Sequence, residues 1–133
     1  MRNAQHWLAA AILACTALAA QAELVVVANP AVGPLTKDQV ADVFLGKSQA
    51  YTPFDQTDAS PAYADFYKKA TGRDVAQVKA TWSRVIFSGK GQAPKQLADA
   101  AAVKKAVAAD PKGVGYIDKA AVDGTVKVVL TLE

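Results

Sequence analysis

The chain has 133 residues, with 15 Lys or Arg against 12 Asp or Glu and a formal charge of +3. Its charges are interspersed, so no basic stretch indicates nucleic-acid binding. One histidine, His6, and one cysteine, Cys15, are present, and both lie within the first 22 residues. The rest of the chain lacks the commonest general base, metal ligand and thiol nucleophile. We therefore expect neither an enzyme nor a metal or cofactor site.

Residues 1–22 have the form of a cleavable secretory signal peptide. A nearly unbroken apolar run follows Arg2 and ends at Ala20-Gln21-Ala22, a small-x-small cleavage triplet. We expect cleavage after Ala22 and a mature periplasmic domain of residues 23–133. The apolar run is shorter than a spanning helix, so no transmembrane segment is expected in the mature chain. Cys15 offers an alternative, lipidated processing site.

The mature domain begins with a predicted strand and helix. Leu24-Val25-Val26-Val27-Ala28 is a β-branched run that ends at a turn, Asn29-Pro30. Thr36 and Gln39 have capping-box spacing, and an apolar helix face follows before Gly46. We therefore expect a buried strand followed by an amphipathic helix.

Two helices are predicted back to back in the middle of the chain. A short strand is expected at 51–54, after which Ser60-Pro61 supplies an N-cap and a first helical residue. Thr71-Gly72 ends that helix, and Asp74 caps the next one, which continues to Ser88-Gly89. Helically spaced aromatic residues are expected in the core, with an exposed contact surface as the alternative: Tyr63, Phe66, Tyr67, Trp82 and Phe87.

The last part of the chain is predicted as a helix and two strands. An alanine-rich helix is expected at 99–109, and strands at 113–117 and 125–132. Alternating apolar residues of the last strand are expected on one face: Val126, Val128, Leu130 and Leu132. The element order predicts one α/β domain, a three-layer mixed sheet with helices on both faces.

Three segments, 35–47, 87–91 and 111–117, together resemble the phosphate-type periplasmic solute-binding proteins of ABC transporters. They read LTKDQVADVFLGK, FSGKG and PKGVGYI. The resemblance implies a fold like one lobe of a type II periplasmic binding protein. It implies a binding module related to phosphate substrate-binding proteins, with a small oxyanion such as phosphate as its ligand. Only the second lobe of the two-lobed family is matched, so half of the anion clamp is missing.

The resemblance also places a candidate ligand turn at 56–62. In the family this turn reads Arg-x-Asp-Gly-Ser-Gly-Thr at a helix N-terminus, whereas here it reads QTDASPA. Asp58 and Ser60 are kept, but the arginine is replaced by Gln56, so a forked charged donor is lost. The resemblance therefore implies ligand contacts from Gln56, Asp58 and Ser60, and weak binding.

Each candidate site residue also has a structural explanation. Ser60 is positioned to receive an anion at a helix N-terminus or only to cap that helix. Ser88 and Lys90 form either a nest of backbone amides beside an ammonium group or an ordinary helix C-cap. Two functions stay open: weak oxyanion binding, or an accessory interaction domain that has lost its ligand. The second would have a periplasmic or membrane protein as its partner.

Overall fold

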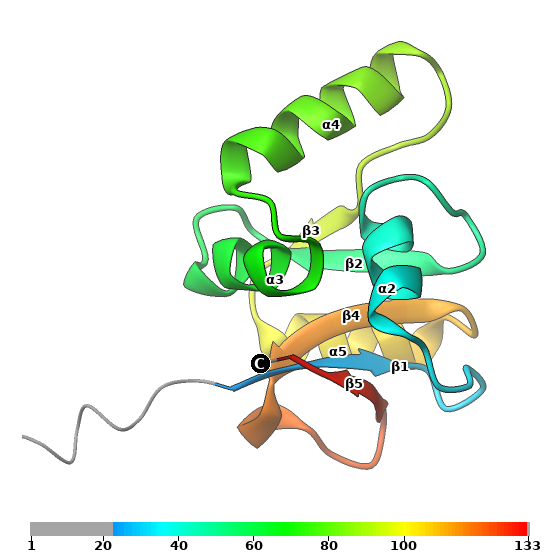
Figure 1. Cartoon of the computed structure of the whole chain (residues 1–133). Coiled ribbons are helices and arrows are strands. Elements are labelled where there is room, and N and C mark those ends of the chain that lie inside the picture. Colours follow the sequence, from blue (N-terminus) through cyan, green and yellow to red (C-terminus); the bar gives the residue numbers. More distant parts are fainter. Residues whose placement is uncertain (1–22, 133) are drawn as a thin grey trace, which may run out of the picture.

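The computed structural model describes residues 23–132, which form one mixed sheet with helices packed on it (Figure 1). The predicted signal peptide, with Cys15, lies outside the described residues. The elements in chain order are β1 (Leu24–Ala28), α2 (Lys37–Phe44), β2 (Thr52–Gln56), α3 (Pro61–Thr71), α4 (Val75–Phe87), β3 (Lys95–Leu97), α5 (Ala100–Ala109), β4 (Gly113–Asp118), the 3-10 turn η2 (Lys119–Ala121) and β5 (Lys127–Thr131).

The sheet has five strands in the order β3-β2-β4-β1-β5. Strand β2 runs parallel to β3 and β4, whereas β1 runs antiparallel to β4 and β5. The predicted mixed sheet is thus confirmed. Because β2 and β3 are parallel neighbours and each leads into a helix, the helices α3 and α5 begin at the same edge of the sheet.

Two separate cores pack on the two faces of the sheet, which confirms the three-layer architecture. On one face α2, α3 and α4 cover an aromatic core that includes Phe44, Phe66 and Tyr116. On the other face α5 covers a smaller aliphatic core around Val103, Val107 and Ile117. Figure 1 shows α5 on the opposite side of the sheet from α2 and α3.

The helices begin at the caps that the sequence predicted. Thr36 with Gln39, and Asp74 with Gln77, form complete capping boxes at α2 and α4. Ser60 caps α3, which ends at Gly72 with a φ of 75°, in the left-handed region that favours glycine. The local capping rules therefore fix the helix boundaries.

Strand β3 was not predicted. Its three residues are polar or only partly buried, and they pair with β2 at the edge of the sheet through the backbone. So short a segment carries no hydrophobic alternation from which a strand can be recognised.

The predicted single apolar face of β5 is wrong. Strand β5 contains a β-bulge. Val26 pairs with Leu130 and Val27 with Val128, so Val129 has no opposite residue on β1. The bulge reverses the alternation of side chains, so Val126 joins the core under α5 and Leu132 joins the aromatic core. Val128 is 43% exposed.

The aromatic residues of α3 and α4 are in the core with one exception. Tyr63, Phe66 and Tyr67 are buried, and the Trp82 indole N–H donates to the Phe44 carbonyl at 2.9 Å. Phe87 is 95% exposed, so the core prediction is wrong for this residue, and the alternative of a contact surface stays a prediction. No helix among residues 23–132 is long and apolar enough to cross a bilayer.

Candidate functional site

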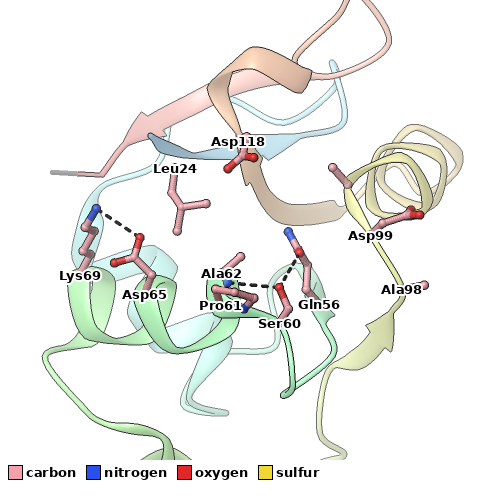
Figure 2. A pocket seen from close by; sticks show the side chains of 11 residues that line it. Leu24, Gln56, Ser60, Pro61, Ala62, Asp65, Lys69, Ala98, Asp99 and Asp118 are labelled. Carbon is pink, nitrogen blue, oxygen red and sulfur yellow. Dashed lines mark hydrogen bonds and ion pairs between the residues drawn. The ribbon is translucent and has the colours of Figure 1, made fainter. Parts of the chain in front are cut away.

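A cleft of about 620 Å³ lies at the edge of the sheet where α3 and α5 begin (Figure 2). It is bounded by the end of β2, the start of β1 and the end of β4, in addition to the two helix N-termini. Crevices outside the carboxyl ends of parallel strands are the usual ligand sites of open α/β sheets. The residues that line it are Leu24, Gln56, Ser60, Pro61, Ala62, Asp65, Lys69, Ala98, Asp99, Ala100 and Asp118.

Gln56 and Ser60 meet on one wall of this cleft, but they bond to the protein itself. The Gln56 side chain is buried, and its Nε2 donates to the Tyr116 carbonyl at 3.0 Å. Its Oε1 accepts from the Ser60 hydroxyl at 3.2 Å. Gln56 is therefore a structural cross-link between β2, α3 and β4, and an arginine here would break these bonds.

The α3 N-terminus is capped by the chain's own atoms. The Ser60 Oγ accepts from the Ala62 backbone N–H at 3.2 Å, and Pro61 has no N–H to offer. The next amide, Tyr63 N–H, donates to the Ser60 carbonyl at 3.0 Å. Few first-turn donors are left there for an anion.

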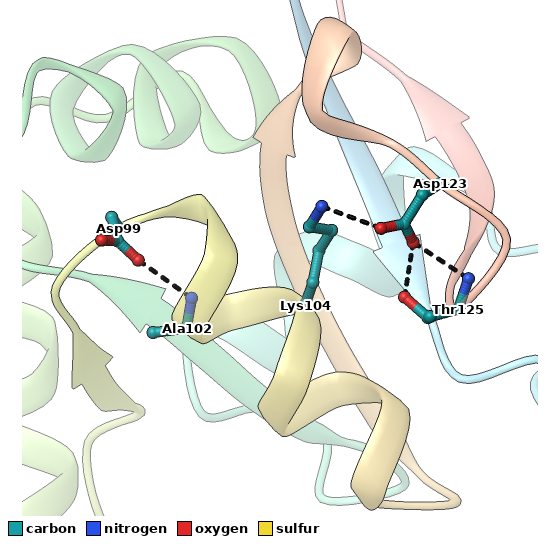
Figure 3. Close-up of polar contacts among 5 residues, drawn as sticks. All are labelled: Asp99, Ala102, Lys104, Asp123 and Thr125. Carbon is teal, nitrogen blue, oxygen red and sulfur yellow. Dashed lines mark hydrogen bonds and ion pairs between the residues drawn. The ribbon is translucent and has the colours of Figure 1, made fainter.

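A carboxylate already occupies the α5 N-terminus. Asp99 Oδ1 accepts from the Ala102 backbone N–H at 2.9 Å, as Figure 3 shows. A negative side chain at this position satisfies the positive end of the helix dipole. Both helix N-termini at the cleft are thus occupied by oxygens of the protein.

The charge of the cleft lining is negative. Asp65 pairs with Lys69 at 3.3 Å, which leaves Asp99 and Asp118 as two carboxylates without a cation in the lining. Like charges repel each other, most strongly where the dielectric constant is low. The electrostatics of this cleft disfavour a phosphate dianion and favour a cationic group.

Asp58 does not line the cleft. Its carboxylate pairs with Lys79 of α4 at 2.8 Å, on the exposed surface. The Lys79 hydrogen bond and charge hold the pKa of Asp58 below its usual range. Of the three residues in the candidate turn, the fold brings Gln56 and Ser60 into the cleft and turns Asp58 toward α4.

Ser88 and Lys90 lie at the C-terminus of α4 and do not line the cleft either. The Gly89 amide donates to the Ile86 carbonyl at 3.0 Å and the Lys90 amide donates to the Val85 carbonyl at 3.1 Å. This is the hydrogen-bond pattern of a Schellman C-cap, with Gly89 in the left-handed region. These two amides are therefore engaged with the helix, and a ligand role for Ser88 and Lys90 stays a prediction.

Asp55, next to Gln56 on β2, is a buried carboxylate that the sequence analysis missed. It is 2% exposed and accepts hydrogen bonds from the hydroxyls of Tyr67, at 2.8 Å, and Tyr116. Burial raises its pKa to about 6, although these hydrogen bonds act in the opposite direction. Burial and the Asp55 charge also raise the pKa of both tyrosines.

Tyr116 connects this buried group to the cleft. Its hydroxyl accepts from the Gln56 backbone N–H at 3.2 Å, and its carbonyl accepts from the Gln56 side chain. The wall of the cleft is thus held by a hydrogen-bond network that extends into the aromatic core.

The acidic lining of the cleft was also not predicted from the sequence. Asp65, Asp99 and Asp118 come from three distant segments, and only the strand order brings them together. Asp99 follows β3, which is parallel to β2, and this places it at the same edge as Ser60. Because β3 was not recognised in the sequence, this position was not predictable.

The fold is similar to that of one lobe of two solved proteins described as phosphate receptors or substrate-binding proteins of ABC transporters. A structure of an ABC-type phosphate transport receptor from Vibrio cholerae superposes with a TM-score of 0.63 and 20% identity. A putative phosphate ABC transporter substrate-binding protein from Clostridium perfringens, solved with bound phosphate, gives a TM-score of 0.60 and 17% identity.

The match covers most of this chain but less than half of either neighbour. It spans 81% of this chain in both cases, against 46% of the Vibrio protein and 44% of the Clostridium protein. No family model matches the chain, and comparison with curated protein sequences gives no match. The similarity therefore establishes the fold of a single lobe.

Proposed function

We propose that this chain is an exported accessory binding module that presents its acidic cleft to a basic segment of a protein partner. The observation that carries the proposal is that the cleft has capped helix N-termini and a negative lining. Its two helix N-termini are capped by Ser60 and Asp99, and the lining carboxylates that make no ion pair within residues 23–132 are Asp99 and Asp118. A lysine or arginine side chain of a partner would find carboxylate acceptors there.

The single-lobe fold supports the same proposal. The chain matches less than half of each neighbour, and its cleft is only partly enclosed by residues 23–132. A small anion in an open cleft keeps much of its water, which weakens every contact that it makes. A protein partner would cover the open side of the cleft with its own surface.

A short cationic probe tests this function. We expect a tetralysine peptide, titrated into the isotope-labelled protein, to shift the backbone NMR signals around Asp65, Asp99 and Asp118. Asp118→Asn should weaken this binding about threefold or more. Asp38→Asn is the matched control, because Asp38 is an acidic residue of α2 outside the cleft. Shifts spread evenly over the surface, or an Asp118→Asn variant that binds as well as the parent, would contradict the proposal.

Weak oxyanion binding is the second candidate function. It is favoured by the position of Ser60 at a helix N-terminus in the cleft and by the phosphate bound to the Clostridium neighbour. This candidate predicts millimolar binding of phosphate, about −4 kcal/mol. The accessory-module proposal predicts no phosphate-dependent heat in calorimetry up to roughly the same concentration.

Gln56→Arg separates the two functions further. If the cleft is an anion site, a guanidinium beside Ser60 should raise phosphate affinity about tenfold, since a charge-assisted hydrogen bond contributes about 1.5–3 kcal/mol. The same change breaks the Gln56 bonds to Tyr116 and Ser60, so thermal stability must be measured alongside. Unchanged phosphate affinity in a folded variant excludes the anion site.

Export is tested by mass spectrometry of the protein recovered from the cell envelope. The proposed cleavage makes Glu23 the first residue, one position before β1. A chain that begins at a lipidated Cys15 would contradict this part of the proposal.

A further inference from the structure

The C-terminal end of α4 is the most exposed apolar feature among the described residues. Phe87 is 95% exposed and its neighbour Ile86 is 51% exposed. In Figure 1, α4 lies beyond α3 and β3, with its C-terminal end directed away from the sheet. Large exposed side chains that pack on nothing in their own fold mark contact surfaces.

Two cations flank these two side chains in the sequence, and a third is in a neighbouring loop. Arg84 lies one turn before Phe87 on the same helix, and Lys90 follows three residues after it. The loop of Lys47 lies alongside, because Gln49 donates to the Lys90 carbonyl at 2.6 Å. All three cations are exposed, and none makes an ion pair within residues 23–132.

Acidic residues are absent from this part of the sequence. Residues 75–98 contain Lys79, Arg84, Lys90 and Lys95 but no Asp or Glu. Lys79 is neutralised by Asp58, and the other three face solvent. Residues 75–98 therefore carry a net positive charge, in contrast to the acidic lining of the cleft.

We infer that the α4 tip, formed by Ile86 and Phe87 with Arg84, Lys90 and Lys47, docks on an anionic lipid surface. Phe87 would enter the interface between headgroups and acyl chains, and the three cations would face the lipid phosphates. The cleft contains no residue of α4, so this contact leaves it free. The inference thus goes beyond the proposed function.

The shape of the tip favours lipid over a protein partner. A stable protein interface needs about 800 Å² on each side with a packed apolar centre. The tip offers two exposed apolar side chains at a helix end that projects from the rest of the fold in Figure 1. A projecting apolar wedge with a basic rim suits insertion into a fluid interface, and a second copy would bring like charges together.

Vesicle sedimentation tests this inference with protein recovered from the cell envelope. Vesicles of 30% phosphatidylglycerol in phosphatidylcholine should bind the protein at 50 mM salt, whereas vesicles of phosphatidylcholine alone should bind at least fivefold less. Raising the salt to 500 mM should release it, because the attraction is screened. Wild type and variants have the same N-terminus, so a difference in their bound fractions is due to the substitution at the α4 tip.

Two pairs of variants separate the apolar and charged contributions. Phe87→Ser should lower the bound fraction at least fivefold, and Val128→Ser, at an exposed apolar residue of β5, should leave it unchanged. Lys90→Gln should lower it about threefold, whereas Lys105→Gln on α5 should not. Circular dichroism should show all four variants folded, since each altered side chain faces solvent.

Three results would overturn the inference. One is a wild-type protein that does not bind anionic vesicles. Another is a Phe87→Ser variant that binds them as well as wild type, which would mean charge attraction without insertion. The third is Phe87-dependent self-association in ultracentrifugation without vesicle binding, which would identify a second copy as the occupant.

Discussion

The two faces of the sheet are packed by different means. On the α3 face, aromatic rings contact one another, and Phe66 and Tyr116 stack with centroids 4.0 Å apart. On the α5 face, valines approach the backbone of β4, and a Cβ on Gly115 would lie 2.6 Å from a Val103 methyl carbon. The first face accommodates a buried polar network, whereas the second depends on the absence of side chains. We therefore expect the loss of a side chain to destabilise the α3 face most, and the addition of a side chain to destabilise the α5 face most.

The largest expected effect is on the aromatic face. Trp82→Ala removes a buried ring and its hydrogen bond to Phe44, so it should lower the free energy of unfolding by about 3–5 kcal/mol in urea denaturation. Phe87→Ala, on the same helix but exposed, should change it by less than about 0.5 kcal/mol. Equal effects of the two substitutions would refute the placement of Trp82 in the core.

The buried network of the aromatic face should make stability depend on pH. Asp55 titrates near pH 6 when folded and near 3.8 when unfolded, so the folded state retains a proton that the unfolded state has lost. Its protonation therefore favours folding, and this contribution falls as the pH rises from about 4 to 6. From pH 4.5 to 7 the loss is about 2 kcal/mol.

Urea denaturation at pH 4.5 and at pH 7 measures this loss. Residues 23–133 contain no histidine, the side chain whose ordinary pKa lies between these two pH values. Asp55→Asn should abolish most of the difference between the two pH values. A variant with the wild-type pH dependence would assign the effect to another group.

On the α5 face, adding volume should be harmful. Gly115→Ala places a methyl group against Val103 and Val107, and overpacking of this kind costs about 1–3 kcal/mol. Val103→Ala in the same chain should recover part of that loss by making room, which a double-mutant cycle measures. Gly124→Ala, which meets no atom within 4 Å, is the control. Equal costs at Gly115 and Gly124 would disprove the close approach of α5.

The smallest effect concerns the C-terminus of α5. Asn29 Nδ2 donates to the carbonyls of Val107 and Ala108 at 3.2 and 3.0 Å. Asn29→Ala should cost about 1 kcal/mol and lower the melting temperature by roughly 4 °C. Asn29→Asp should not restore stability, because it puts a negative charge at the negative end of the helix. Full stability in Asn29→Asp would show that these two donors contribute nothing.

Local sequence rules account for most of the fold. The helices start at Thr36, Ser60, Asp74 and Asp99 because each side chain can accept a bond from the first turn that follows it. Strands β1 and β4 are apolar and buried, so composition identifies them. Strand β3 and the bulge in β5 are set by pairing with other strands, which no local pattern contains.

The candidate site was only partly predictable, because its charges depend on the topology. Ser60 and Gln56 were found through the resemblance and do line the cleft. Gln56 was expected as a ligand contact, yet Tyr116, far away in the sequence, determines its hydrogen bonds. Phe87 fits the helical period of its aromatic neighbours. The C-terminal end of α4 projects from the rest of the fold, however, so no other element among residues 23–132 covers Phe87.

The adjacency of the first and last strands has a consequence for engineering. The Leu132 amide donates to the Leu24 carbonyl at 3.1 Å, so the two ends of the described chain lie beside each other at the cleft, where Leu24 forms part of the lining. A few linker residues would join them, and new ends could be opened in the exposed segment 92–93. Such a circular permutant would keep every strand pairing while moving the termini from the mouth of the cleft to the neighbourhood of Phe87.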